Sequence, residues 1–179
     1  KIKNLLSAVL FLFFASYFAQ NTIEVMSFNI RLGSVDDGEN HWNIRKDKVK
    51  DLINYYEADF VGLQEAQKPQ INYLLENNSL YSFLGKPRDD GENSEFSCIF
   101  YLKNKYKVLE QNTFWLSETP EKSTKSWDAA YPRIVTYALF ENIKTKKKVW
   151  VFNTHFDHVG MVARQKSAEI ILKKMKELQ

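Results

Sequence analysis

Three stretches of mainly apolar residues run along the chain, and each of them ends in polar side chains. They are VMSFN, which ends at Asn29, VGLQE, which ends at Glu65, and VFNTH, which ends at His155. Successive side chains of a strand point to opposite faces, and a strand that is apolar on both faces is buried in the core. We therefore predict three core strands whose polar ends meet at a cleft.

The rest of the pattern predicts helices after the first two strands, and a run of antiparallel strands after Asn77. Apolar residues at helical spacing predict helices over 43–56, 69–75 and 162–178. Extended patterns predict strands over 22–30, 59–64, 81–86, 96–102, 106–117, 134–142 and 149–158. This order predicts a mixed α/β fold in which a sheet packs on a second sheet or on helices.

Residues 1–20 have the layout of a secretory signal peptide. Two lysines precede an apolar run from Leu5 to Phe14, which is short for a membrane span. We expect a secreted or periplasmic protein whose single domain covers residues 21–179 and whose mature chain has no membrane span. An uncleaved anchor is the alternative. Cys98 is the only cysteine, so no intramolecular disulfide can form.

Composition argues against a dedicated nucleic-acid binder without excluding nucleic acid as a substrate. The chain has 44% hydrophobic residues and a formal net charge of +3, so it lacks a strong basic field. Lysines at positions 103, 105, 107 and 144–148 could follow a phosphate backbone. Lysines at hairpin turns also keep sheet edges soluble, and both interpretations of these residues stay open.

The polar strand ends suggest a metal site. A carboxylate at the end of a buried strand is costly unless it is paired, and a hard divalent cation is a suitable partner for Glu65. The carboxylate of Glu65 and the amide oxygen of Asn29 suit Mg²⁺ better than Zn²⁺, because the chain has no set of Cys and His at zinc spacing. Taken singly, each residue also has an ordinary role, as a turn amide or a paired acid.

The ordered set MSFNIR, LQE and NTHFDH resembles the endonuclease/exonuclease/phosphatase superfamily, whose members include DNase I and exonuclease III. The layout is most similar to the secreted bacterial branch, over residues 22–179. The resemblance implies a four-layer DNase I-like fold, with a two-sheet β-sandwich flanked by helices. It also implies hydrolysis of phosphate esters with Mg²⁺, or Mn²⁺ as the alternative.

The resemblance also assigns roles to individual residues. Asn29 and Glu65 would hold the metal, and His155 would hydrogen-bond the phosphate that is cleaved. Four further residues are expected to bind substrate: Arg88, Arg133, Asp157 and His158. For Arg133 and Arg88, a structural role at the surface is the competing interpretation. The expected substrate is a phosphate ester of a nucleic acid, a lipid or a small molecule, and no stable protein partner is implied.

One departure from the family pattern affects the expected activity. Family members carry a Gly-Asp-x-Asn and a Ser-Asp-His motif after the NTH strand, and neither occurs in these 179 residues. We expect a fold that is incomplete at its C-terminus, covers about the N-terminal two-thirds of the domain and is itself inactive. The alternative is a non-catalytic binding module or inactive relic that recognises a phosphorylated ligand. A Ser-His hydrolase is disfavoured because no Gly-x-Ser-x-Gly motif occurs.

Overall fold

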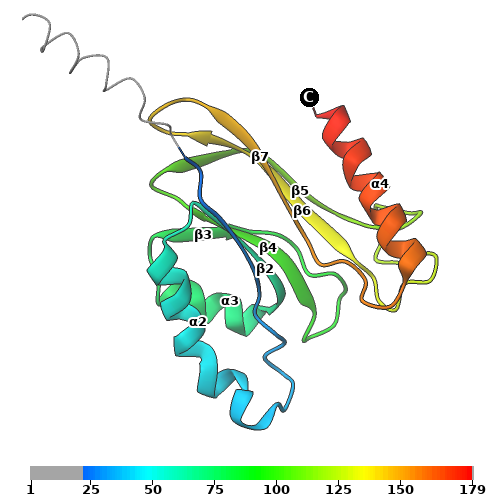
Figure 1. Ribbon diagram of the computed structural model, residues 1–179, viewed down its shortest axis with the longest axis horizontal. Helices are drawn as coiled ribbons and strands as arrows, with labels where there is room; N and C mark the ends of the chain where they lie inside the picture. Colours follow the sequence, from blue (N-terminus) through cyan, green and yellow to red (C-terminus); the bar gives the residue numbers. More distant parts are fainter. Residues whose placement is uncertain (1–21, 179) are drawn as a thin grey trace, which may run out of the picture.

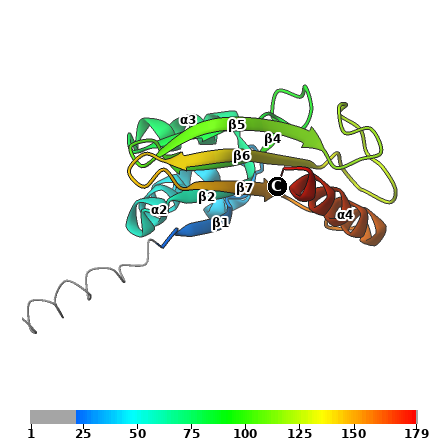
Figure 2. The ribbon, with the colours of Figure 1, turned by 90° about the horizontal axis from the view of Figure 1, so that it is seen from above.

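The computed structural model describes residues 22–178, which form four layers (Figures 1 and 2). Two β-sheets pack face to face, two helices cover the outer face of the first sheet, and a third long helix lies against the second. The segment predicted as a signal peptide, residues 1–20, lies outside the described residues. Within residues 22–178, no helix is both long enough and apolar enough to span a membrane.

The first sheet has the order β1-β2-β4-β3 and the second has the order β5-β6-β7. β1 and β2 are parallel because a helix connects them, and all other neighbours are antiparallel. The strands are β1 (Val25–Asn29), β2 (Phe60–Gln67), β3 (Tyr81–Leu84), β4 (Glu95–Leu102), β5 (Tyr106–Trp115), β6 (Ile134–Asn142) and β7 (Lys148–Thr154).

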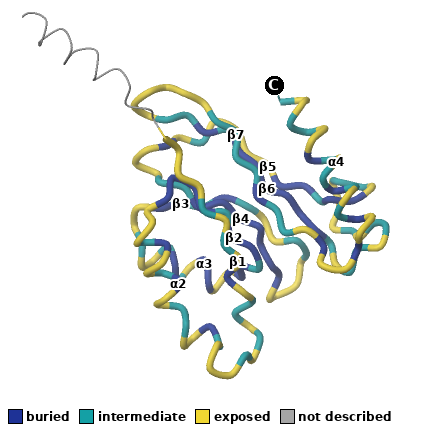
Figure 3. Tube along the Cα trace, viewed as in Figure 1, coloured by how far each residue is buried: buried dark blue, intermediate teal, exposed yellow. Residues whose placement is uncertain are grey.

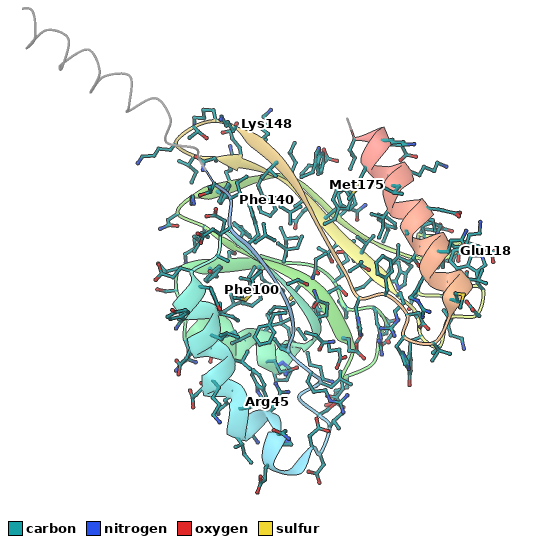
Figure 4. All side chains as sticks on the ribbon, in the orientation of Figure 1. Arg45, Phe100, Glu118, Phe140, Lys148 and Met175 are labelled. Atoms are coloured by element: carbon teal, nitrogen blue, oxygen red, sulfur yellow. The ribbon has the colours of Figure 1, made fainter. Side chains whose placement is uncertain are left out.

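Three apolar clusters hold the layers together, and they follow the alternation of side chains along the strands (Figures 3 and 4). The helices α2 (Trp42–Tyr56) and α3 (Lys68–Glu76) pack on one face of the first sheet around Phe100. Phe140 lies in the cluster between the sheets. The helix α4 (Met161–Glu177) packs Ile171 and Met175 against the second sheet. The expected four-layer α/β sandwich is therefore confirmed.

Strand β2 continues three residues beyond the predicted end at residue 64, and Glu65 forms a bulge within it. The pairing of β2 with β4 shifts register between Leu63 and Ala66, and Glu65 adopts a left-handed backbone conformation with φ of 57°. A bulge inserts an extra residue, bends the strand and redirects a side chain. Here it directs the Glu65 carboxylate away from the core. Backbone strain of this kind is common at functional sites.

Asn153 of β7 joins the two sheets beside this bulge. Its amide nitrogen donates hydrogen bonds to the backbone carbonyls of Leu63 (2.9 Å) and Cys98 (2.8 Å), which belong to the first sheet. Its amide oxygen accepts a hydrogen bond of 2.7 Å from Gln64. The predicted strand from residue 149 ends at Thr154, so Asn153 is the last inward-pointing residue and His155 lies in the loop that follows.

Contact with Asn153 explains the glycine at position 62. A Cβ atom there would lie 2.7 Å from Oδ1 and 2.8 Å from Cγ of Asn153, closer than packed atoms approach. We expect Gly62→Ala to lower the free energy of unfolding by about 1–3 kcal/mol through overpacking, and Asn153→Ala to lower it by about 3 kcal/mol through unsatisfied buried groups. Urea denaturation of both variants and of the double variant measures their coupling.

If the clash with Asn153 is the reason for the glycine, Gly62→Ala will lower the free energy of unfolding less than half as much in the Asn153→Ala background. The space for the added Cβ atom is then free. Additive costs of the two changes would show instead that Gly62 is required for a reason other than Asn153.

Candidate functional site

The polar ends of the strands meet around one pocket of about 470 Å³. Five of the seven residues predicted for the site line it: Glu65, Arg88, Arg133, His155 and His158. They come from β2, from two loops that precede strands, and from the loop after β7. Asn29 contacts Glu65 directly, and Asp157 lies buried behind Arg133. The fold thus brings together residues separated by up to 129 positions.

Glu65 is held in place by Asn29 and by the backbone of the loop that follows β1. Asn29 Nδ2 donates a 2.8 Å hydrogen bond to Glu65 Oε1, and the backbone N–H of Leu32 donates to Oε2 at 3.3 Å. Asn29 Oδ1 accepts a hydrogen bond from the backbone N–H of Arg31 at 2.9 Å. Both polar atoms of the Asn29 amide are therefore used, and in this arrangement they orient the Glu65 carboxylate.

His155 lies beside the same carboxylate. Its Nε2 is 3.5 Å from Glu65 Oε1. Burial lowers the pKa of the His155 imidazole, the charge of Arg133 lowers it further, and the opposing effect of Glu65 does not reverse the shift. Since the ordinary value is already near 6.5, the ring is neutral at neutral pH and one of its nitrogens can accept a proton or a hydrogen bond.

Arg133 is positioned by Asp157, which does not line the pocket itself. Asp157 is 2% exposed, and its Oδ2 accepts hydrogen bonds from Arg133 Nε (3.1 Å) and from the backbone N–H groups of Ala130 and Tyr131. Its Oδ1 accepts hydrogen bonds from the backbone of Val159 and Gly160. Asp157 therefore joins the loop before β6 to the loop after β7.

Arg133 lines the pocket as well as pairing with Asp157. Arg133 Nη2 lies 3.1 Å from His158 Nδ1, so the imidazole of His158 and the guanidinium form adjacent parts of one wall. Arg133 is only 5% exposed. A buried guanidinium in a fixed orientation suits a bidentate contact with a phosphate group.

Four further residues that line the pocket were not predicted as site residues: Arg31, Leu32, Glu95 and Tyr131. Arg31 directly follows the Ile30 that ends the first apolar run, and this was a usable signal. Glu95 begins β4 and Tyr131 lies in an irregular loop, where no periodicity indicates which side chain points inward. Their positions depend on strand pairing across the first sheet and on the backbone hydrogen bond from Tyr131 to Asp157.

The donors at Glu65 fit a hard divalent cation only with additional ligands. A carboxylate oxygen is a ligand that Mg²⁺ prefers, and Glu65 is the acid to which Asn29 donates a hydrogen bond. Within residues 22–178, no group of three or more His, Cys, Asp and Glu side chains could enclose a metal ion. Water and substrate would therefore complete the coordination shell.

A larger cavity of about 560 Å³ lies elsewhere, between β5, the loop after it and α4. Its walls include Trp115, Glu121, Lys173 and Glu177, and none of the predicted site residues is among them. Size alone would favour this cavity, but the convergence of polar groups favours the pocket at Glu65.

Replacement of Asp157 tests whether it anchors this wall. Burial alone would raise the pKa of Asp157, but hydrogen bonds from Gly160, Ala130, Val159 and Arg133 lower it below its ordinary value. Asp157→Asn leaves the buried Arg133 without a counter-ion, so we expect the free energy of unfolding at pH 7 to fall by about 3–5 kcal/mol. Urea denaturation measures this loss, with the exposed Asp90→Asn as the control.

The pH dependence provides a second check. A lowered carboxyl pKa contributes stability above the unfolded value near pH 4, and this contribution is lost as pH falls towards the folded value. The difference in free energy of unfolding between the original protein and Asp157→Asn should therefore stay constant from pH 5 to 7 and shrink below about pH 4. A gap independent of pH would contradict the assigned role of the charge.

The sequence and fold of the chain are similar to those of solved proteins. A solved endonuclease/exonuclease/phosphatase from Bacteroides vulgatus is 43% identical, with a TM-score of 0.83 over 87% of this chain and 60% of its own. A mannosyl-6-phosphatase from Bacteroides thetaiotaomicron is 36% identical, with a TM-score of 0.83 over 88% of this chain and 60% of its own. The chain thus spans about 60% of the length of these structures.

A curated relative, the uncharacterized protein L388 of Acanthamoeba polyphaga mimivirus, is 29% identical over 124 residues, which are 65% of this chain and 46% of that protein. No family model matches the sequence. The four-layer sandwich agrees with the likeness to the solved structures. The chain belongs to the endonuclease/exonuclease/phosphatase superfamily.

Proposed function

We propose that the protein containing this chain is a divalent-metal-dependent hydrolase of phosphate esters. The observation that carries this proposal is the convergence of Glu65, His155 and Arg133 on one pocket, although they lie far apart in the sequence. A carboxylate for a cation, a neutral imidazole and a buried guanidinium are groups that can bind a phosphoryl group and stabilise its charge.

Each residue has a separate task in this proposal. Glu65, oriented by Asn29, would hold Mg²⁺ or Mn²⁺, which when bound supplies positive charge against the oxygens of the phosphoryl group. His155 would hydrogen-bond a phosphate oxygen, and Arg133 would contact another through the nitrogens that Asp157 leaves free. His158 lies against Arg133 Nη2 and would close the same side of the phosphate. All these groups are fixed before substrate binds, which lowers the cost of organising them.

The similar structures support the reaction class and leave the substrate open. One of them is described as a mannosyl-6-phosphatase, which acts on a phosphate ester of a sugar. A nucleic acid, a lipid or a small organic phosphate each presents the same group to the pocket, and the fold alone does not choose among them. A secreted or periplasmic location remains part of the proposal.

The test uses the full-length protein and bis-p-nitrophenyl phosphate as substrate. We expect Mg²⁺ or Mn²⁺ to support hydrolysis, EDTA to abolish it, and Glu65→Gln to lower kcat/KM by at least 100-fold because the anionic ligand is lost. Release of p-nitrophenol measures the rate. Glu110→Gln, an exposed acid on β5, is the matched control.

Calorimetric titration with Mn²⁺ gives a readout that does not need activity. The original protein should bind the ion, and Glu65→Gln should bind it at least tenfold more weakly. Hydrolysis that is equal with and without EDTA would reject the metal assignment. Binding of a phosphorylated ligand with no cleavage in any metal would favour the non-catalytic binding module.

A further inference from the structure

The pocket is also lined by an ion pair that the proposed reaction does not use. Arg88 Nη2 lies 2.6 Å from Glu95 Oε1, and the two side chains are 13% and 11% exposed. Both residues line the pocket together with Glu65. A site that only held a metal ion and one phosphate would not need Glu95, a second acid beside Glu65 that is paired with an arginine.

Arg88 is held by several contacts, unlike an arginine that extends freely into solvent. Its backbone N–H donates to the Glu95 carbonyl at 2.9 Å, and its carbonyl accepts hydrogen bonds from Trp115 Nε1 (2.7 Å) and Ser123 Oγ (2.6 Å). These contacts fix the backbone of Arg88, and the ion pair with Glu95 holds its guanidinium. Within the described residues, Arg88 Nε is the one buried side-chain polar atom without a hydrogen-bond partner, although Asp89 Oδ2 lies 3.5 Å away.

The charges around the pocket disfavour a second anion. Each of its three arginines already contacts a carboxylate: Arg31 contacts Asp37 at 2.9 Å, Arg88 contacts Glu95 and Arg133 contacts Asp157. Glu65 and Glu95 would repel further phosphates of a polyanion. A paired guanidinium and carboxylate instead offer donors and acceptors side by side, which suits neutral hydroxyl groups.

Tyr131 provides an apolar wall above this pair. Its side chain is exposed, with the residue 49% accessible, and the guanidinium carbon of Arg88 lies 5.0 Å from its ring centroid. The ring of His158 is nearly parallel to it, at 6.0 Å and 22°. An aromatic ring beside hydrogen-bonding groups can pack against the carbon face of a sugar while its hydroxyls are bound at the edge.

The lysine-rich turns do not lead towards the pocket. Lys147 and Lys148 lie near Lys105 at the hairpin end of the second sheet, where Figure 4 shows Lys148 at the start of β7. The site is at the other end of that strand, about 20 Å away for seven residues at the usual rise. No continuous basic track built from these lysines therefore joins a polymer backbone to the site.

We infer that the Arg88–Glu95 pair and Tyr131 form a specificity subsite for the hydroxyl-bearing part of a small organic phosphate, such as a hexose phosphate. This inference rests on the proposed function for the position of the phosphate, next to Glu65, His155 and Arg133. The pocket volume of about 470 Å³ suits a ligand of that size. Arg88 and Glu95 bind hydroxyl groups, and Tyr131 packs against the ring.

The test compares three substrates of the full-length protein in Mg²⁺: glucose 6-phosphate, AMP and p-nitrophenyl phosphate. Release of inorganic phosphate gives kcat/KM for each. We expect Glu95→Gln and Tyr131→Ala to lower kcat/KM for the hexose phosphate at least tenfold more than for p-nitrophenyl phosphate, which has no hydroxyls. Tyr55→Ala, an exposed tyrosine on α2 (80% accessible), is the matched control and should leave the ratio unchanged.

Equal losses on all substrates would overturn the inference, because the pair would then only shape the pocket. A preference for AMP that depends on Tyr131 but not on Glu95 would also overturn it, since the ring would then stack on a base. Because Tyr131 is exposed, its variant keeps the test valid if Glu95→Gln fails to fold.

Calorimetric binding of glucose 6-phosphate separates this inference from the proposed function. If no substrate is hydrolysed in any metal, the proposed function fails. Binding that is at least tenfold weaker in Glu95→Gln or Tyr131→Ala would still support the subsite. Binding that is unchanged in both variants would remove it.

Discussion

The structure depends on the junction that Asn153 makes between the two sheets. Its amide satisfies two backbone carbonyls of the first sheet and accepts a hydrogen bond from Gln64, all in the buried interior. A buried polar group is tolerated only when it is hydrogen-bonded, and a satisfied network then favours a single arrangement. This network lies next to the bulge at Glu65, so the same contacts that join the sheets also set where the carboxylate emerges.

The chemistry of the pocket follows from this placement. Glu65 leaves the core because the bulge turns it outward, and Asn29 and the Leu32 backbone then fix its direction. On the opposite wall, Asp157 fixes Arg133 and joins two loops through backbone hydrogen bonds. Each functional group is therefore held by a partner behind it, which leaves its remaining donors or acceptors free for a ligand.

The same pairing limits what the pocket can accept. A cluster of unpaired arginines would attract polyanions. Arginines that each have a carboxylate partner contribute oriented hydrogen-bond donors and little net charge. The apolar ring of Tyr131 adds contact area without charge. The proposed ligand, one phosphate with a compact polar group attached, matches this balance of charge.

The sequence alone indicated the strands, the helices and most residues of the candidate site. Alternating apolar residues predicted the strands, helical spacing predicted α2, α3 and α4, and the polar ends at Asn29, Glu65 and His155 indicated the chemistry, because these signals depend only on neighbouring residues. The tertiary structure decided the rest. The bulge at Glu65, the inward position of Glu95 and Tyr131, and the placement of Asp157 behind Arg133 arise from strand pairing and from loop contacts between distant residues. No local pattern encodes them, since a loop takes its conformation from the partners that satisfy its backbone.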